Sequence, residues 1–490
     1  MENGIMLQYF EWNLPADGLL WKRCTAQAEQ IKKEGFTAVW LPPAYKGGAG
    51  LNDAGYGVYD LYDLGEFEQK GTIATKYGKF EEYLEAIRTL QWAGLEVLGD
   101  VVLNHRMGAD RLENLRAQPV NPKNRTEKMG ELQEVSVWTE FSFDGRAGKY
   151  SDFTWNWQHF TGIDWDEKNK QNQIFLFEGK DWSPFVDKEN GNYDYLMGAD
   201  VDFSHPNVRD ELLQWGKWYL DTTGINGLRL DAVKHIDSQW YSEWLGEIRQ
   251  HTGREVFAVG EYWHADLERQ LSYLKGCGDC MSLFDVPLHY RFFEASYSNG
   301  NYDMSTLLQN TLVESDPIHA VTFVDNHDTQ PGQSLFSWVN DWFKPLGYAV
   351  ILLRESGYPC VFYGDYYGIP ANNIGPTRML RLLLQIRLRY AYGIQHDYFD
   401  NPNVVGWTRE GDIKHRLSGL AALMSDGQGG EKRMYIGTQF AGIGFRDCTG
   451  RCLGEVVIDD EGFGVFRVEG GAVSVWVQPE AYNELFIFGY

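Results

Sequence analysis

Two carboxylates, Asp231 and Glu261, stand at the ends of two apolar runs, Gly227–Val233 and Val256–Trp263. Side chains alternate along a strand, so Arg229 and Asp231 fall on one strand face. An Arg and an Asp on a buried strand are costly unless paired. The first run therefore predicts either a structural ion pair or a strand end that places a reactive group.

Two further apolar runs end in the same kind of side chain. Val97–His105 carries Asp100, Asn104 and His105, and Val321–Asp328 carries Asp325, Asn326, His327 and Asp328. Four buried strands that each end in Asp, Glu, Asn or His indicate a site where strand ends converge.

The spacing of neighbouring strands, about 4.8 Å, allows Asp231 and Glu261 to face each other at about 5 Å, as in a retaining glycosidase. Arg229, one pleat behind Asp231, would keep that carboxylate ionised. Glu261 follows an apolar strand and precedes Tyr262 and Trp263, so desolvation should raise its pKa, as suits an acid. The alternative is a metal site, which Asp100, Asp231 and Asp328 could form in another barrel.

The elements that position these residues alternate between strands and amphipathic helices. Eight strands are predicted: Met6–Trp12, Ala38–Pro42, Leu95–His105, Gly227–Val233, Val256–Trp263, Met281–Leu288, Ala320–His327 and Cys360–Asp365. Apolar positions at 3-4 spacing predict helices over Lys79–Gly94, Asn207–Asp221, Ser238–Gly253, Asp266–Lys275, Met304–Val313, Lys344–Glu355 and Thr377–Tyr390. This count is that of a (β/α)₈ barrel, whose active sites lie at the carboxyl ends of the strands.

Two segments do not fit the barrel pattern. Residues 105–206 are too long for a barrel loop and contain short alternating runs, which predicts an inserted β-rich domain after the third strand. Residues 394–490 have strand-and-turn texture without helices, which predicts a C-terminal antiparallel β domain. Residues 1–104 and 207–393 would form the barrel.

Composition narrows the class of partner. The 490 residues carry 44 Lys and Arg against 69 Asp and Glu, a formal charge of −25, which argues against nucleic acid and anionic membranes. No run of 18 apolar residues predicts a membrane span, and Met1–Trp12 lacks the pattern of a secretory signal. The six cysteines do not form a disulfide pattern, and Cys277 and Cys280 lack the second pair of a zinc site. We expect a cytoplasmic, monomeric protein with free thiols.

Four stretches, in this order, resemble the signature motifs of the alpha-amylase family: Asp100-Val-Val-Leu-Asn-His105, Gly227-Leu-Arg-Leu-Asp-Ala-Val-Lys-His235, Glu261-Tyr-Trp263 and Phe323-Val-Asp-Asn-His-Asp328. Leu7-Gln-Tyr-Phe-Glu-Trp12, Gly55–Gly65, Glu189–Met197 and Thr329–Gln333 are similar to the bacterial liquefying type in particular. The resemblance covers nearly the whole chain.

The resemblance implies a role for each matching residue. Asp231 would be the nucleophile, Glu261 the general acid and base, and Asp328 a third carboxylate that grips sugar hydroxyls. Substrate-binding roles would fall to Tyr56, His105, Arg229, Lys234, His235, Trp263 and His327. Taken singly, each His or aromatic residue is more often packed than ligand-binding.

The resemblance also implies one calcium ion. Asn104, Asp194, Asp200 and the backbone carbonyl of His235 would hold it, and hard oxygen ligands suit that cation. Secreted relatives carry further acids for a second calcium and a sodium. The matching positions here are Thr161, Ser183 and Ser204, with Asp202 left, so a single structural calcium is expected.

The function expected is endo-acting hydrolysis of α-1,4-glucosidic bonds in starch, glycogen or maltodextrins, with retention. A transglycosidase or a maltooligosaccharide-forming exo-enzyme of the same family is the first alternative. A non-catalytic glucan-binding protein is the second, disfavoured because Asp231, Glu261 and Asp328 are all present.

Overall fold

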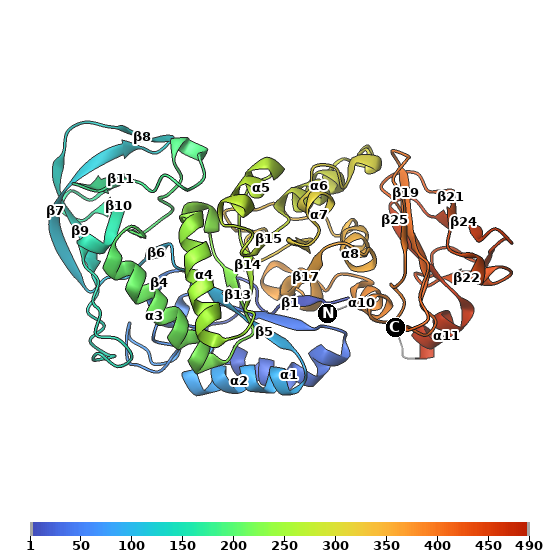
Figure 1. The fold of residues 1–490 in the computed structure, drawn as a ribbon, viewed down its shortest axis with the longest axis horizontal. Coiled ribbons are helices and arrows are strands. Elements are labelled where there is room, and N and C mark those ends of the chain that lie inside the picture. Colours follow the sequence, from blue (N-terminus) through green and yellow to red (C-terminus); the bar gives the residue numbers. More distant parts are fainter. Residues whose placement is uncertain (1–2, 488–490) are drawn as a thin grey trace.

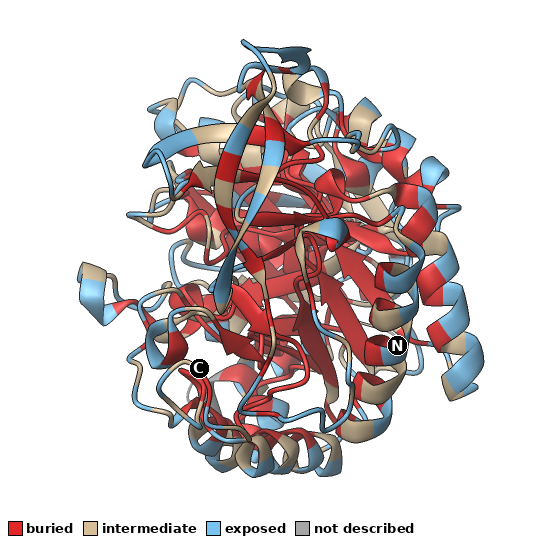
Figure 2. Cartoon of the chain, turned by 90° about the vertical axis from the view of Figure 1, so that its left-hand side faces the viewer, coloured by how far each residue is buried: buried red, intermediate tan, exposed pale blue. Residues whose placement is uncertain are grey.

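Eight short parallel strands close into a barrel at the centre of the molecule (Figure 1). The structure is a computed structural model that describes residues 3–487. In barrel order the strands are β1 (Met6–Gln8), β2 (Ala38–Leu41), β5 (Glu96–Val101), β13 (Gly227–Leu230), β14 (Phe257–Gly260), β15 (Ser282–Phe284), β16 (Ala320–Phe323) and β17 (Tyr358–Phe362). Nearly all their residues are buried, as expected for parallel strands covered on both faces (Figure 2).

Helices surround the barrel. They are α1 (Leu20–Lys33), α2 (Phe80–Trp92), α3 (Pro206–Thr223), α4 (Ser238–Thr252), α5 (Leu267–Gly276), α6 (Val286–Tyr297), α8 (Lys344–Leu353) and α10 (Leu380–Arg389), with short α7 (Leu312–Ser315) and α9 (Tyr363–Tyr367) between them. Local sequence sets their ends: α4 begins where the Asp237 side chain accepts the Gln239 N–H and ends at Gly253 in the left-handed conformation.

The part of the chain between β5 and α3 forms a second sheet, at the left of Figure 1. Its strands are β6 (His105–Arg106), β7 (Arg111–Asn121), β8 (Asn124–Lys128), β9 (Gln133–Glu140), β10 (Phe160–Asp166), β11 (Gln171–Phe177) and β12 (Ala199–Val201). We propose residues 105–206 as the extent of this inserted domain, with the barrel formed by 1–104 and 207–393.

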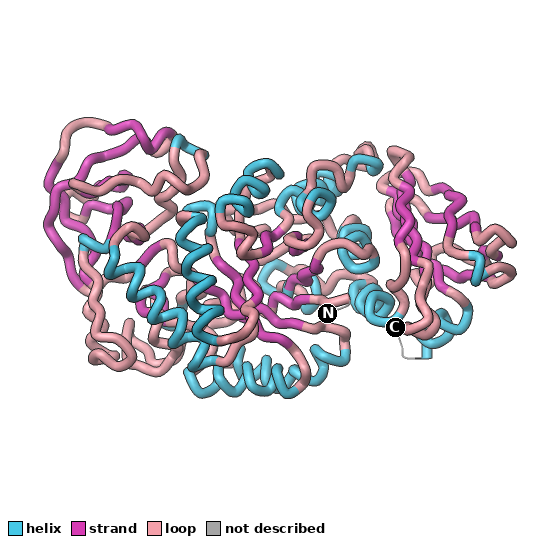
Figure 3. The backbone as a smooth tube through the Cα atoms, in the orientation of Figure 1, coloured by secondary structure: helices cyan, strands magenta, loops and turns pink. Residues whose placement is uncertain are grey.

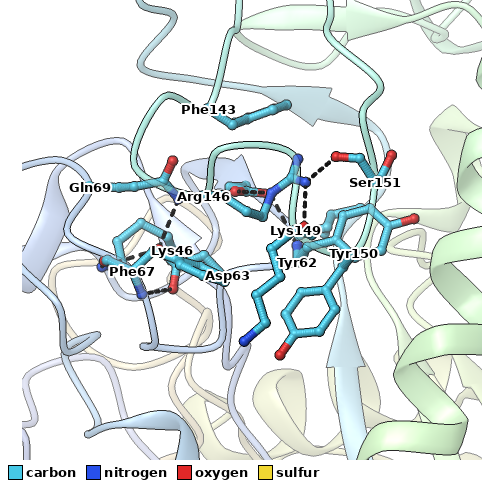
Figure 4. A network of polar contacts seen from close by, with 12 residues as sticks. Lys46, Tyr62, Asp63, Phe67, Gln69, Phe143, Arg146, Lys149, Tyr150 and Ser151 are labelled. Atoms are coloured by element: carbon cyan, nitrogen blue, oxygen red, sulfur yellow. Dashed lines mark hydrogen bonds and ion pairs between the residues drawn. The ribbon is translucent and has the colours of Figure 1, made fainter.

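A buried ion pair joins this inserted region to the long loop after β2, which contains β3 (Lys46–Gly47) and β4 (Val58–Asp60). Arg146 Nε lies 2.9 Å from Asp60 Oδ2, and both side chains are about 1% exposed. Gln69 donates from Nε2 to Asp60 and Asp63 at 3.0 Å each, and Lys46 Nζ lies 3.3 Å from Asp63 (Figure 4). The loop that carries Tyr56 is therefore fixed by charge pairs shielded from water.

The C-terminal strands form a separate group at the other end of the molecule (Figure 3). An antiparallel sheet has the order β18 (Gln395–Tyr398), β19 (Val404–Arg409), β20 (Leu420–Ser425), β25 (Ala472–Val477), β22 (Gly444–Asp447) and β23 (Val456–Val457), and β21 (Gly430–Tyr435) pairs with β24 (Phe463–Val468). A core of its own includes Phe445, Phe466 and Trp476. We propose 394–490 as the extent of this domain.

The predicted fold class, a (β/α)₈ barrel with an inserted β-rich domain and a C-terminal antiparallel β domain, is confirmed. Among the described residues no helix is long and apolar enough to cross a bilayer.

Four predictions of secondary structure were wrong. The strand expected over Met281–Leu288 ends at Phe284, because the Asp285 side chain accepts the Leu288 N–H and starts α6, with Pro287 in its first turn. The strand expected over Cys360–Asp365 ends at Phe362, where α9 begins. Met304–Val313 is a short 3₁₀ turn followed by α7, and the C-terminal region, expected to lack helices, ends in α11 (Pro479–Ile487).

Candidate active site

A cavity of about 450 Å³ lies where the carboxyl ends of the barrel strands meet the inserted sheet. Eight of the predicted residues line it: Tyr56, His105, Asp231, Lys234, His235, Glu261, Trp263 and Asp328. Asp231 and Glu261 each follow a barrel strand directly, so two strand ends place both carboxylates in one cavity.

Arg229 connects the buried carboxylates from behind the cavity. Its guanidinium is fully buried; Nη1 lies 2.9 Å from Asp100 Oδ1 and 2.6 Å from Asp231 Oδ1, and Nη2 lies 2.9 Å from Glu261 Oε2. One planar fork thus touches both cavity carboxylates on different nitrogens, a geometry available to Arg and not to Lys. The sequence allowed two interpretations of Arg229 and Asp231, a structural ion pair or a strand end that places a reactive group. In the structure the two residues form an ion pair, and Asp231 also lines the cavity.

The backbone after Asp231 helps to orient Glu261. Ala232 has φ +49°, a left-handed conformation that is uncommon for a residue with a Cβ, and its N–H donates to Glu261 Oε2 at 3.1 Å. Backbone strain of this kind is typical of functional sites. The turn that ends β13 therefore presents Asp231 and supports Glu261 at the same time.

Burial gives the two carboxyls raised pKa values. Burial raises the pKa of Asp231 to about 6, against the lowering effect of Arg229, and the negative charge of Asp100 adds to the rise. Burial also raises the pKa of Glu261, again opposed by Arg229, with Asp231 adding to the rise. At pH 7 Asp231 is mostly ionised, and the Glu261 pKa moves in the direction expected for a proton donor.

The third carboxylate and the two histidines complete this end of the cavity. Burial and the neighbouring Glu261 raise the pKa of Asp328 well above its usual range. His327 accepts from Gln8 Nε2 at Nδ1 (2.9 Å), which leaves Nε2 facing Asp328 Oδ2 at 3.3 Å. His105 donates from Nε2 to the Tyr56 carbonyl at 2.8 Å, and burial lowers its pKa to about 4, so it is neutral at pH 7.

Trp12 was missed as a site residue. It lines the cavity and lies parallel to Tyr56 at 5.7 Å between ring centroids, and to His327 at 6.1 Å. Trp12 follows the first barrel strand, as other site residues follow later strands, and this position could have identified it from the sequence. The remaining missed lining residues come from loops: Asp53, Ala54, Gly57, Met107, Tyr193, Leu196, Met197, Ala232, Ser334 and Leu335.

Lys234 also lines the cavity. Its Nζ donates to the Trp263 carbonyl at 3.0 Å and lies 3.1 Å from Glu189 Oε2, while the Trp263 Nε1 donates to Tyr290 Oη at 3.1 Å. His235 Nδ1 pairs with the Tyr193 carbonyl at 2.6 Å, which links the barrel to the inserted domain. The structure thus brings all ten predicted catalytic and substrate-binding residues to one cavity or its immediate backing.

Comparison with known proteins decides the family. A family model described as "Alpha amylase, catalytic domain" matches residues 21–379, and one described as "Alpha-amylase C-terminal" matches residues 428–477. The chain belongs to the alpha-amylase family. It is 54% identical over 479 residues to an alpha-amylase of Geobacillus stearothermophilus, covering 97% of this chain and 87% of that protein.

Two other alpha-amylase family relatives bear on finer properties. The cytoplasmic alpha-amylase of Escherichia coli (strain K12) is 42% identical, with 98% of this chain and all of that protein covered. The glucan 1,4-alpha-maltohexaosidase of Bacillus sp. (strain 707) is 51% identical, with 97% and 92% covered. The solved Anoxybacillus alpha-amylase matches the fold with a TM-score of 0.64 at 18% identity, over 97% of each chain.

The residues predicted to hold the calcium of this alpha-amylase family chain fit a hard cation. Both polar side-chain atoms of Asn104 are buried without a hydrogen-bond partner. Burial raises the pKa of Asp194 to about 7 and that of Asp200 well above its usual range, and the negative charge of Asp194 adds to the rise at Asp200. A partnerless amide and two buried carboxylates that repel each other are what a bound cation would compensate. No group of three His, Cys, Asp or Glu suited to a metal occurs in residues 3–487.

The neighbouring positions already have protein partners. Lys180 forms an ion pair with Asp202, and the Ser204 hydroxyl donates to Asp202 Oδ1 at 2.5 Å. Thr161 donates its hydroxyl to Asp200, and the Ser183 N–H donates to Asp194 Oδ2 at 2.9 Å. An ammonium and two hydroxyl groups therefore contact Asp202 and Asp200.

Proposed function

We propose that this alpha-amylase family enzyme hydrolyses internal α-1,4-glucosidic bonds of starch, glycogen and maltodextrins with retention of anomeric configuration. The observation that carries the proposal is the single Arg229 guanidinium that touches both Asp231 and Glu261 at the ends of adjacent strands. Two carboxyls held side by side, one mostly ionised and one with a raised pKa, are the pair that double displacement requires.

In the first step Asp231 attacks the anomeric carbon while Glu261 transfers its proton to the leaving glycosidic oxygen. The C–O bond to the leaving sugar breaks, and a covalent glycosyl–Asp231 ester forms. In the second step Glu261, now ionised, takes a proton from water, whose oxygen attacks the anomeric carbon and releases Asp231. Asp328 and neutral His105 and His327 bind hydroxyls of the reacting sugar.

The aromatic residues on the two sides of the cavity suit different parts of the glucan. Tyr56, parallel to His327 at 5.1 Å between centroids, offers a flat surface under the reacting sugar. Lys234, His235 and Trp263 lie on the leaving-group side. Arg229 positions Asp231 and keeps it ionised.

We propose one structural calcium held by Asn104, Asp194, Asp200 and the His235 carbonyl. The ion would supply positive charge between the inserted domain, which provides Asp194 and Asp200, and the barrel, which provides Asn104 and His235. A second calcium or a sodium is not expected, because Lys180 already neutralises Asp202.

We propose a cytoplasmic monomer. The relative named a cytoplasmic alpha-amylase is matched over its whole length, and all six cysteines are free thiols. Cell fractionation of the source organism and light scattering of the purified protein test the two statements.

A time course on soluble starch tests the function. Iodine colour, reducing ends and product anomers are followed together, and a fast loss of colour with few new reducing ends and α-anomeric products is expected. Slow colour loss with one short product would favour an exo-acting enzyme, which the maltohexaosidase relative makes the second candidate. New linkages or lengthened chains would indicate a transglycosidase, and no cleavage at all would overturn the proposal.

A further inference from the structure

A buried charge network lies beneath the loop that carries His327 and Asp328. At its centre is Lys344, the first residue of α8, which is 1% exposed. Its Nζ lies 2.8 Å from Asp325 Oδ2 and also forms an ion pair with Asp365, whose other oxygen accepts from Tyr348 Oη at 2.6 Å. The Nζ lies 3.1 Å from the centroid of the Trp338 ring.

Helix stability does not explain this lysine. A positive charge at the first turn of a helix opposes the helix dipole, and burial of an ammonium is costly in itself. The position is one that ordinary helix chemistry would give to an acidic or neutral residue. The ammonium is instead placed to contact Asp325, two residues beyond the end of β16.

A chain of hydrogen bonds connects Asp325 to the turn that presents Asp328. Thr329 donates its hydroxyl to Asp325 Oδ1 at 2.8 Å, and the same hydroxyl accepts the Asn326 N–H at 3.0 Å. The Asn326 side-chain oxygen accepts the N–H groups of Asp328 (2.9 Å) and Thr329 (3.0 Å). Every link is buried or partly buried, so water competes weakly for these bonds.

We propose that Lys344 is a positioning residue for the proposed third carboxylate, acting through Asp325, Thr329 and Asn326 to fix the backbone of Asp328. The inference rests on the proposed function only in the role given to Asp328. Lys344 does not line the cavity, so it touches no substrate. Without its ammonium, Asp325 and Asp365 are two buried carboxylates with no cation between them, and the turn loses its fixed partner.

The test compares Lys344→Met with a matched buried cation. Arg387 is 2% exposed and donates to the carbonyls of Leu352, near the other end of α8, and of Gly4, before β1, and it does not line the cavity. Misplacement of a reacting group by about 1 Å lowers turnover about 100-fold. Lys344→Met is expected to lower kcat about 100-fold with KM within about threefold. Arg387→Met, assayed at a temperature where circular dichroism shows it folded, should keep wild-type kcat.

Two further measurements separate positioning from general destabilisation. Hydrogen exchange should quicken in the peptide over 324–331 of Lys344→Met and stay unchanged over 227–233. In an Asp328→Asn background, Lys344→Met should add little further loss of kcat, because the group it positions is already removed. Full additivity of the two losses, or a kcat within threefold of wild type for folded Lys344→Met, would overturn the proposal.

If Lys344→Met does not fold, Thr329→Val tests the proposal in its place. This variant removes the hydroxyl that joins Asp325 to the turn and removes no charge. It is expected to lower kcat at least tenfold and to speed hydrogen exchange over 324–331, and a kcat within threefold of wild type overturns the proposal. Failure of the wild-type enzyme to cleave any glucan would refute the proposed function instead, and the exchange measurement would still report on the link between Lys344 and the turn.

Discussion

Replacement of Arg229 by Met should move the acid limb of the pH–activity profile to higher pH. Arg229 is the cation shared by Asp100, Asp231 and Glu261, and with it present the pKa of Asp231 is about 6. An opposite charge at this distance lowers a carboxyl pKa by about 1–3 units. In Arg229→Met the pKa of Asp231 is therefore expected at about 7–9.

The loss of rate follows from the fraction of Asp231 that stays ionised. At pH 7 that fraction falls from about nine tenths to between about one half and one hundredth. Activity at pH 7 should drop about 2- to 100-fold from this cause alone and recover as the pH is raised. Because Asp231 and Glu261 interact, the profile reports apparent pKa values of the pair.

The assay is kcat/KM for a chromogenic maltooligosaccharide from pH 4 to 10, for wild type, Arg229→Met and Arg229→Lys. Arg229→Lys retains the charge and should shift the limb less, although it cannot contact both carboxylates with a planar fork. An acid limb in Arg229→Met within 0.3 units of wild type, roughly the error of such a profile, would refute the assigned charge balance.

Stability gives an independent measure of the same charge balance. The folded-state pKa of Asp231 lies above its unfolded value, so its ionisation opposes folding: stability is lost as the pH rises from about 4 to about 6 and is level above that. In Arg229→Met this loss should extend to the new, higher pKa. The melting temperature of the variant should therefore fall between pH 6 and 9 relative to wild type, and parallel melting curves across that range would contradict the argument.

Three further predictions concern the catalytic carboxylates, the calcium and the inserted domain. Asp231→Asn and Glu261→Gln should each lose activity by at least about 10³-fold yet still bind maltooligosaccharide in calorimetry; near-wild-type turnover in either would refute its role. Elemental analysis after dialysis should find one calcium per chain, and none in Asp200→Asn, whereas two or more in wild type would contradict the single-ion proposal. Arg146→Met should lower the free energy of unfolding by about 3–5 kcal/mol, because it leaves Asp60 buried and unpaired, and an unchanged denaturation midpoint would show that the pair contributes nothing.

The sequence was sufficient for the barrel and for the strand-end residues because both depend on local pattern. Alternation placed Arg229 and Asp231 on one face, and they form a 2.6 Å ion pair in the structure. Apolar runs alone could not separate a strand from the helix that follows it, so the run through Leu288 was read as one strand although Asp285 starts a helix. The overlooked signal was the capping side chain of Asp285, followed by Pro287 in the first turn of the helix.

The contacts that complete the site could not be predicted in this way, since they join residues far apart in the chain. Gln8 and His327 are 319 residues apart and meet only because β1 and β16 lie on either side of β17 in the closed barrel. Trp12 lies parallel to Tyr56 because they follow β1 and β2, two strands that pair side by side in the barrel. Such pairs depend on register and barrel closure, which no periodicity within one segment specifies.

The charges at the strand ends do not cancel, and the imbalance suits the proposed chemistry. Arg229 pairs with three acidic side chains, Asp100, Asp231 and Glu261, so one positive charge is shared among three carboxyl groups. A core selected only for stability would avoid buried carboxylates in excess of cations. Glycoside cleavage passes through a transition state in which the sugar ring carries positive charge. Fixed negative charge beside that ring, kept from water by the barrel wall, stabilises the charge as it develops, so the free energy spent on burying these carboxylates is recovered in the transition state.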